Sequence, residues 1–397
     1  SQERFTRRGV EGWGRRGSRG NDFPPSRMSR DSLPSSTPGH LADPMPMGSR
    51  QSIVEERVER LRALVSSKRA EAALLSSRAN VSWATAGGQH HVVKSTETGV
   101  AGLLVTRDRA WLVAPSIETA RLAAEEVPDL GIEVVPVPWW EREGMADAVG
   151  RLTSGGRVLG DAELAPDLRA MRSVLGASDQ DRLMALGRVA ERAIGDALAD
   201  IEPGQSEDAL AASLVGRLVG VRAPVVLVAA DDRIARYRHP LPSGGAIRRR
   251  VMVVLVAEAW GLHVAATRFR EFEEPTADLA RRIDAVAGVH RAMIDATTIG
   301  ATLGDVFATA QAAYAEAGVP DEWQDHHQGG TIAYQGREVV AVPDDPTRIE
   351  PGMAFAWNPS IAGAKAEDTF VVTVDGDRRF VTGSAPDAAG GGSPPRP

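Results

Sequence analysis

Cysteine is absent from the 397 residues of this chain. Without a thiol the chain can form no disulfide, no thiolate zinc site and no iron–sulfur cluster, and it has no cysteine nucleophile. The Gly-x-Ser-x-Gly elbow that is typical of many serine hydrolases is missing as well. Any catalysis must therefore use His, Asp, Glu, Lys, Tyr, Thr or Arg, or a serine outside such an elbow.

The chain also lacks an excess of positive charge and any long apolar run. Its formal net charge is -7, so it offers no polycationic surface to the phosphate backbone of a nucleic acid. No apolar run reaches the roughly 18 residues that a membrane-spanning helix requires, and the first residues contain no apolar core of a signal peptide. We expect a cytoplasmic protein that binds a small molecule and neither nucleic acid nor membrane.

The apolar residues that are present suffice for two globular domains, because 43% of the chain is hydrophobic. Residues 1–50 are rich in Arg, Gly, Ser and Pro and show no apolar periodicity, which predicts a disordered segment. Met28 lies inside it, so the residues before Met28 are either a tail or upstream sequence read in frame. Residues 384–397 are rich in Ala, Gly, Pro and Ser and are predicted to form a disordered tail.

Residues 51–175 alternate between helix and strand patterns, which predicts an α/β domain. A glycine turn at residues 87–91 is expected to expose His90 and His91. The predicted elements are helices near 52–69 and 117–127 and strands at 72–76, 101–106, 110–114 and 132–137.

Residues 178–383 form the second predicted domain, in which long helices are combined with paired strands. Two of its strands are joined across a tight turn at Trp260-Gly261. The predicted elements are helices at 183–198, 206–218, 275–297 and 302–317 and strands at 225–230, 251–259, 262–269, 353–357 and 369–374.

The stretch most indicative of chemistry runs from Asp325 to Gly330, with the sequence Asp-His-His-Gln-Gly-Gly. Side chains alternate on an extended segment, so one of the two adjacent rings, His326 or His327, is expected to point inward and the other elsewhere. The two glycines allow the backbone to approach a ligand closely.

Five landmarks follow one another along the second predicted domain. They are Tyr237-Arg238-His239-Pro240, Gly261 with Thr267-Arg268, the stretch from His326, Pro351-Gly352-Met353, and Glu367-Asp368-Thr369. In this order they make the chain resemble the pita-bread superfamily of aminopeptidase P, prolidase, methionine aminopeptidase and creatinase. The resemblance implies an α/β creatinase-type N-terminal domain, an α+β pita-bread C-terminal domain, and a homodimer.

Peptidases of this superfamily bind two metal ions with two Asp, one His and two Glu, because divalent ions that share a bridging water need several anionic oxygens. The resemblance places Val254 and Ala265 at the two Asp positions, Gly330 at the His position and Asn358 at the first Glu position. Only Glu367 remains. We therefore expect no catalytic metal in this position and no other cofactor.

Creatinase, a member of the superfamily, is metal-free and uses a His as general acid and base, and His239 matches that position. We predict that His239 moves the proton, that His326 or His327 orients the substrate or stabilises developing charge, and that Glu367 holds a cationic group. Arg337 replaces a family His, and its guanidinium is expected to bind a substrate carboxylate. The other predicted substrate-binding residues are Arg268, Tyr334, Asn358, Trp357, Gln328 and Glu258.

These assignments predict a metal-independent, creatinase-like homodimer that cleaves a C–N or related bond in a small polar amino-acid or peptide derivative. Three alternatives remain open. The same pocket would serve a lyase or isomerase of a specialised pathway, the protein would be a non-catalytic pita-bread binding protein, or a different ligand alignment would make it a metallo-aminopeptidase of the Xaa-Pro type. The loop with His90 and His91 is similar to segments that reach the partner's site in creatinase-like dimers, although a plain surface loop is the favoured reading.

Overall fold

The computed structural model describes residues 41–45 and 49–383. Residues 1–40, 46–48 and 384–397, all of which were predicted to be disordered, lie outside the described ranges. The first helix, α1 (Ser49–Ser67), begins before position 50. Among the described residues, no helix combines the length and the apolar character needed to cross a membrane.

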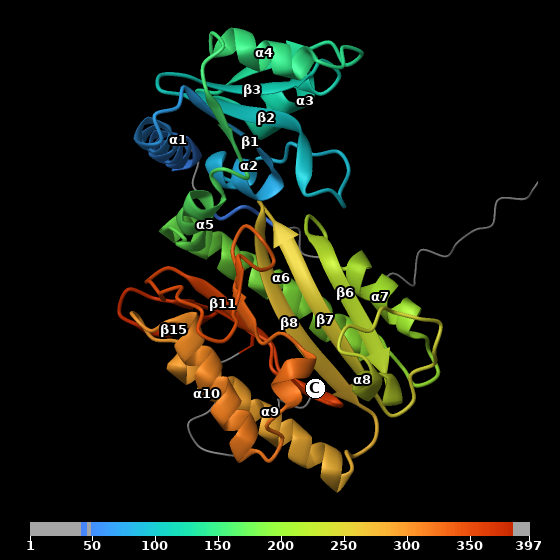
Figure 1. The fold of residues 1–397 in the computed structure, drawn as a ribbon. Helices are drawn as coiled ribbons and strands as arrows, with labels where there is room; N and C mark the ends of the chain where they lie inside the picture. Colours follow the sequence, from blue (N-terminus) through green and yellow to red (C-terminus); the bar gives the residue numbers. More distant parts are fainter. Residues whose placement is uncertain (1–40, 46–48, 384–397) are drawn as a thin grey trace, which may run out of the picture. The chain divides into compact units, whose positions relative to one another are not determined.

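The N-terminal half is built on a five-stranded mixed sheet, as the alternating pattern predicted (Figure 1). Its strand order is β4-β3-β2-β1-β5, with antiparallel pairing in the centre and a parallel pair at each edge. The buried face of α1 repeats at Val54, Val58, Leu61 and Val65, the spacing at which helical side chains share one face. The remaining elements are β1 (Ala72–Ser77), α2 (Arg78–Ala84), β2 (Thr98–Thr106), β3 (Ala110–Pro115), α3 (Thr119–Arg121) with a π-helical turn at Leu122–Glu126, β4 (Glu133–Val137), α4 (Gly144–Leu152), β5 (Val158–Gly160) and α5 (Ala165–Ser173).

The C-terminal half combines long helices with a three-stranded sheet, a five-stranded sheet and a two-stranded hairpin. The three-stranded sheet has the order β6-β7-β8, and the five-stranded sheet has the order β10-β9-β11-β14-β15. The helices are α6 (Ala177–Asp200), α7 (Glu207–Gly216), α8 (Asp232–Arg236), α9 (Ala277–Ala296), α10 (Leu303–Glu316) and the 3₁₀ helix Glu322–Asp325. The strands are β6 (Arg222–Ala230), β7 (Arg250–Ala259), β8 (Leu262–Glu271), β9 (Gly329–Thr331), β10 (Val339–Val340), β11 (Ala354–Trp357), β12 (Ser360–Ile361), β13 (Ala364–Lys365), β14 (Asp368–Val372) and β15 (Arg378–Phe380).

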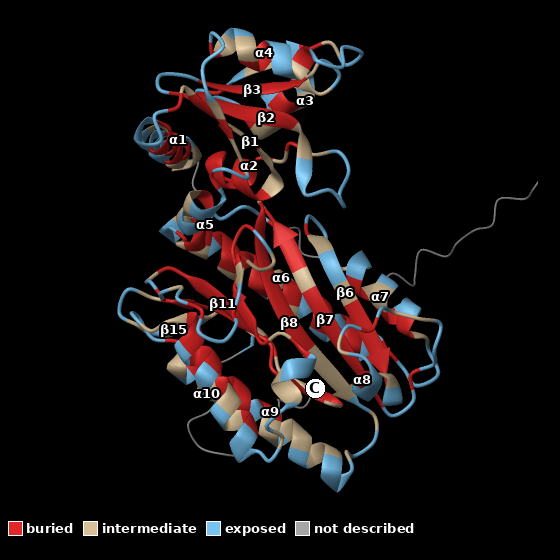
Figure 2. Cartoon of the chain, viewed as in Figure 1, coloured by how far each residue is buried: buried red, intermediate tan, exposed pale blue. Residues whose placement is uncertain are grey.

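The hairpin of β7 and β8 positions the site, and Figure 2 shows β7 buried along almost its whole length. Trp260 and Gly261 both have positive φ, 52° and 80°, as a two-residue hairpin turn requires. Because strand side chains alternate, Val253 and Leu255 join the core that contains α6, whereas Val254 lies on the opposite face. One face of this hairpin is therefore anchored and the other is free to line a cavity.

The second sheet packs against α9 and α10, and its core is aromatic. Phe355 stacks between Trp357 and Phe370, with ring centroids 5.7 Å apart in both pairs. Thr302 forms a reciprocal capping box with Asp305 at the start of α10.

Two histidines outside the predicted site are deeply buried. His90, which was expected to be exposed, is only 1% exposed, because its ring turns back onto the carbonyl oxygen of Ser76 at 3.1 Å. His91 is half-buried and contacts Arg222 of the same chain. His290 in α9 is 6% exposed, and its Nε2 has no hydrogen-bond partner among the described residues. Burial lowers the pKa of both His90 and His290 to about 4.

These lowered pKa values predict that stability falls on mild acidification. Between pH 6.5 and about 4 the unfolded chain binds protons at His90 and His290 that the folded chain does not, so stability is complete above pH 6.5 and is lost as the pH falls. A shift of this size corresponds to about 3 kcal/mol per residue at most. Urea unfolding at pH 7 and pH 4.5 should show a smaller loss for His290→Gln than for the unmodified chain; an identical loss would contradict the assignment to His290.

Candidate active site

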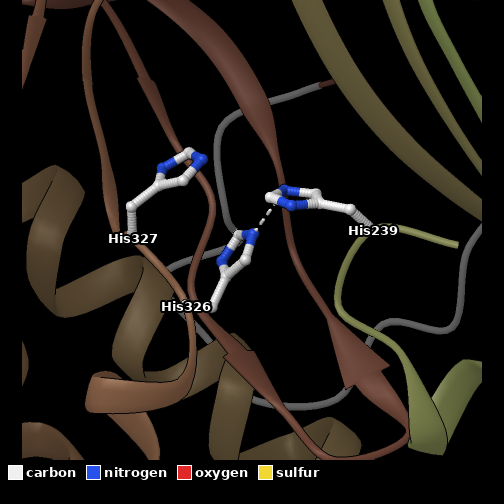
Figure 3. A group of neighbouring side chains, drawn as sticks. All are labelled: His239, His326 and His327. Atoms are coloured by element: carbon white, nitrogen blue, oxygen red, sulfur yellow. Dashed lines mark hydrogen bonds between the residues drawn. The ribbon is translucent and has the colours of Figure 1, made fainter.

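Three histidines converge in space, although 87 residues separate the first from the second. His239 lies in the loop after α8, and His326 and His327 follow the 3₁₀ helix. Figure 3 shows the three rings directed toward one another. The Nε2 atoms of His239 and His326 lie 3.0 Å apart in a hydrogen bond, and one ring nitrogen of each of the three residues lies within 4.8 Å of the others.

The expectation that the adjacent rings point in different directions is wrong. The rings of His326 and His327 stack, with centroids 4.6 Å apart, and both face His239. The cause is local: the backbone N–H of Gly329 donates to Nδ1 of His327 at 3.3 Å and turns this ring alongside its neighbour. In the neutral ring of His327 the proton consequently resides on Nε2, which becomes a hydrogen-bond donor toward the cluster.

The loop that carries His239 is fastened to the segment that carries His326. The guanidinium of Arg238 forms ion pairs with Glu322 and, at 3.2 Å, with Asp325, both in the 3₁₀ helix. The side chain of Gln328 braces the same segment from inside, because it donates to the carbonyl oxygens of Trp323 and His326 and accepts from the Tyr314 hydroxyl. Gln328 was predicted to bind substrate, but these contacts already occupy its amide.

A cavity of about 230 Å³ lies beside the histidines. Its sheet side is aliphatic, formed by Val225, Leu227, Val254 and Val256 of β6 and β7. The rest of its lining is mainly polar and includes His239, His263, His327, Arg337, Asn358, Lys365 and Glu367. The structure therefore brings five of the predicted catalytic and substrate-binding residues to one cavity, namely His239, His327, Glu367, Arg337 and Asn358, and it adds Lys365 and His263.

Glu367 is held on every side by the protein. Its carboxylate forms ion pairs with Arg337 at 2.8 Å and Lys365 at 3.4 Å and accepts a hydrogen bond from Thr267 Oγ1 at 2.7 Å. Glu367 is 2% exposed. Burial alone would raise the pKa of Glu367, but Lys365, Arg337 and the Thr267 hydroxyl outweigh it and lower the pKa to about 2. Glu367 was predicted to hold a cationic substrate group, but both of its carboxylate oxygens are already used by these contacts.

The three imidazoles are neutral near pH 7. Burial, and after it the positive charge of Lys365, lowers the pKa of His326 to about 2 and also lowers the pKa of His239. Burial and then Arg337 lower the pKa of His327 to about 4. Each neutral ring has one lone pair and one N–H. His327 uses its lone pair to accept from the Gly329 N–H, and His239 and His326 share one N–H and one lone pair in their mutual hydrogen bond.

Comparison with known proteins agrees with this architecture. The profile of the Creatinase/Prolidase N-terminal domain matches residues 57–174, and that of Metallopeptidase family M24 matches residues 181–374. The chain belongs to the pita-bread family of creatinase and aminopeptidase P. A curated relative, the probable dipeptidase PepE of Mycobacterium bovis, is 27% identical over 300 residues, which cover 67% of this chain and 78% of that protein.

Solved pita-bread structures share the fold at low sequence identity. The dipeptidase PepE from Mycobacterium ulcerans has 20% identity and a TM-score of 0.67, covering 84% of this chain and 96% of that one. The Xaa-Pro dipeptidase from Bacillus anthracis has 19% identity and a TM-score of 0.67, covering 83% and 98%. These likenesses establish the fold, and the chemistry has to be argued from the cavity itself.

The dimetal centre of pita-bread peptidases does not fit the residues of this cavity. Val254, which the sequence resemblance places at an Asp ligand position, is an aliphatic lining residue of the cavity, and Glu367 is neutralised by two side-chain cations. At Gly330, the position of the family's His ligand, a Cβ would lie only 1.9 Å from the carbonyl oxygen of Val339. Within the described residues, the one His/Cys/Asp/Glu group with metal-ligand spacing is His239, His326 and His327, which excludes Glu367.

Three predicted substrate-binding residues are occupied by contacts within the protein. Trp357 stacks in the aromatic core and donates from Nε1 to Thr297 Oγ1 at 2.9 Å. Arg268 forms ion pairs with Glu191 and Asp368, and it also donates to the backbone oxygen of Glu367 at 3.2 Å. Glu258 is bound by Arg78 and Arg222.

Tyr334, also predicted to bind substrate, is not among the residues that line the 230 Å³ cavity. Its hydroxyl donates to Asp179 Oδ1 at 2.8 Å and accepts from Arg57 at 3.0 Å. It lines a larger cavity of about 980 Å³, which shares the lining residues Pro224, His263, Gly336 and Arg337 with the smaller one.

Asn358 is the predicted residue whose position best suits ligand contact. It is 2% exposed and lines the cavity, and its Oδ1 has no hydrogen-bond partner among the described residues. A buried, unpaired acceptor is costly, so it is suited to accept a hydrogen bond from a ligand N–H or O–H.

Lys365 is the important site residue that the sequence argument missed. It lies two residues before Glu367, and the period of two in extended chain would have placed both side chains on the same face. Its side chain is 5% exposed, and burial lowers the pKa of its ammonium group while Glu367 opposes that effect.

Proposed function

We propose that this protein is a metal-independent hydrolase that cleaves a C–N bond in a small amino-acid or peptide derivative with a free carboxylate. The observation that carries the proposal is the charge of the cavity wall, where two cations, Lys365 and Arg337, face one carboxylate, Glu367. With the imidazoles neutral, this group carries a net charge of about +1, and one substrate carboxylate would balance it.

Arg337 supplies the directed donor for that carboxylate. One Nη is used by Glu367 and the other by the backbone oxygen of Gly336, while Nε is buried and has no partner among the described residues. An unpaired guanidinium N–H in a cavity wall is suited to a charge-assisted hydrogen bond with a carboxylate oxygen. In this proposal Glu367 positions Arg337 and Lys365 and does not itself contact the substrate.

The proton chemistry is assigned to the histidines. His239 takes a proton from a water molecule as that water's oxygen forms a bond to the substrate carbon, and it returns the proton to the leaving nitrogen as the C–N bond breaks. The Nε2–H of His327 stabilises the oxyanion that develops on the carbon's oxygen. His326 holds the ring of His239 through the 3.0 Å hydrogen bond and acts as a positioning residue.

The first test is ligand binding, which does not require knowledge of the best substrate. A small set of dipeptides and their C-terminal amides is titrated by calorimetry. We expect the free acids to bind at least about tenfold more tightly than the amides, the effect of one charge-assisted contact. Arg337→Gln should remove this preference, whereas Arg281→Gln on the exposed surface of α9 should keep it. Equal affinity for acid and amide in the unmodified protein would overturn the proposal.

A further inference from the structure

The three converging imidazoles have a second capability. We propose that His239, His326 and His327 together bind one divalent cation of the zinc class, with its fourth position open to an anion. This site differs from the dimetal centre of the family in its residues and in its donor atoms, since it uses three nitrogens and no carboxylate.

The distances are close to those of a tetrahedral imidazole site. Zinc–nitrogen bonds of about 2.0–2.1 Å place two ligand nitrogens roughly 3.3 Å apart. The Nε2 atoms of His239 and His326 are 3.0 Å apart, so an ion fits between them after a small separation of the rings. The third nitrogen lies within 4.8 Å of these, and His239 belongs to an exposed loop that has room to adjust.

The donor set selects the kind of ion. Imidazole nitrogens suit Zn²⁺, Cu²⁺ and Ni²⁺, whereas Mg²⁺, Ca²⁺ and Mn²⁺ prefer oxygen ligands. Burial keeps the rings of His326 and His327 unprotonated, so no proton has to be displaced from a charged imidazolium at either of them.

The charges around the cluster require an anion as the fourth ligand. Lys365 and Arg337 disfavour positive charge at the rings, and Glu367 offsets only one of these two cations. A hydroxide, a chloride or a carboxylate on the ion lowers the net positive charge of the site by one. His327 is expected to be the weakest of the three ligands. To bind the ion through Nε2, its ring has to move the proton from Nε2 to Nδ1, and Nδ1 then no longer accepts the hydrogen bond from the Gly329 N–H.

Binding of an ion has a consequence for the proposed reaction. A neutral imidazole has a single lone pair, and an ion bound to His239 uses it, so occupancy and proton transfer exclude each other. Zinc is therefore an inhibitor and a chelator an activator, the reverse of a metal-dependent peptidase. Only this inhibition rests on the proposed function, and the binding itself does not.

The experiment is a titration of chelator-treated, full-length protein with Zn²⁺ in competition with a chromogenic indicator, repeated with Mg²⁺. We expect one Zn²⁺ per chain and no binding of Mg²⁺. His239→Ala and His326→Ala should each weaken zinc binding by more than about 100-fold, beyond the 10–100-fold typical of losing a group that only supports a ligand. His327→Ala should cause a smaller loss, and His91→Ala, which lies outside the cluster, should cause none.

A second measurement uses the unmodified protein, so that the metal site can be tested even if the histidine variants fold poorly. Co²⁺ bound to the unmodified protein should give the intense visible absorption of four-coordinate cobalt, and added Zn²⁺ should abolish it. Absence of saturable Zn²⁺ binding, or equal binding by the folded His239→Ala variant, would overturn the metal site while leaving the proposed hydrolase untouched. Zinc binding without any effect on turnover would instead contradict the role of His239.

Discussion

Replacing Glu367 with Gln is expected to lower the free energy of unfolding by about 3–5 kcal/mol, the usual cost of removing one partner of a buried ion pair. The reason is that the ammonium group of Lys365, 5% exposed, and the guanidinium of Arg337, 16% exposed, would lose their common counter-charge. Gln is isosteric with Glu, so the packing is retained and the loss reports the charge. Urea unfolding at pH 7 measures it.

Two further variants control this result. Adding Lys365→Met to Glu367→Gln removes one orphaned cation and should recover at least about 1 kcal/mol, because contacting residues are energetically coupled. Glu322→Gln breaks a more exposed ion pair with Arg238, and we expect a loss of less than about 1 kcal/mol. A loss for Glu367→Gln as small as that for Glu322→Gln would show that Glu367 is not the centre of the cationic group.

Replacing His239 with Ala is expected to lower turnover of a cleaved dipeptide by about 10²–10⁴-fold, the usual contribution of a general acid–base. Binding of the dipeptide should change little, because its carboxylate is held by Lys365 and Arg337. The free energy of unfolding should also stay nearly constant, since His239 is an exposed loop residue. Initial rates and calorimetric affinities of the same preparations separate these effects.

His91→Ala is the matched control for this loss of turnover, because His91 is half-buried and lies outside the cluster. It should leave turnover unchanged. If His239→Ala retained full turnover, the imidazole would have no part in the proton transfer, and the assignment would fail.

Much of the fold followed from local pattern. The hairpin of β7 and β8 was predicted because two apolar runs flank Trp260-Gly261, and both residues adopt the positive φ of a tight turn. The helix α2 was not predicted, because its seven residues are too few to show helical periodicity. Short strands such as β12 and β13, of two residues each, were not predicted for the same reason.

Site residues could be predicted where the resemblance fixed their positions. They were harder to predict where tertiary contacts decide whether a side chain is free to bind a ligand. His239, His326 and Glu367 were located from the ordered landmarks. Tyr334 and Glu258 looked like ligand contacts, but buried partners far away in sequence, Asp179 for the first and Arg78 for the second, occupy them. No local sequence pattern predicts such partners, because they are contributed by distant elements. The homodimer, the domain limits and the cytoplasmic location stay predictions.

Cleavage without the metal centre of the family is tested most directly by one measurement. Full-length protein is treated with a strong chelator, shown to be metal-free, and assayed on a panel of small dipeptides with free carboxylates. We predict that cleavage persists or increases after chelation and disappears in His239→Ala. Cleavage that is lost on chelation and returns only with two divalent ions per chain would contradict the account.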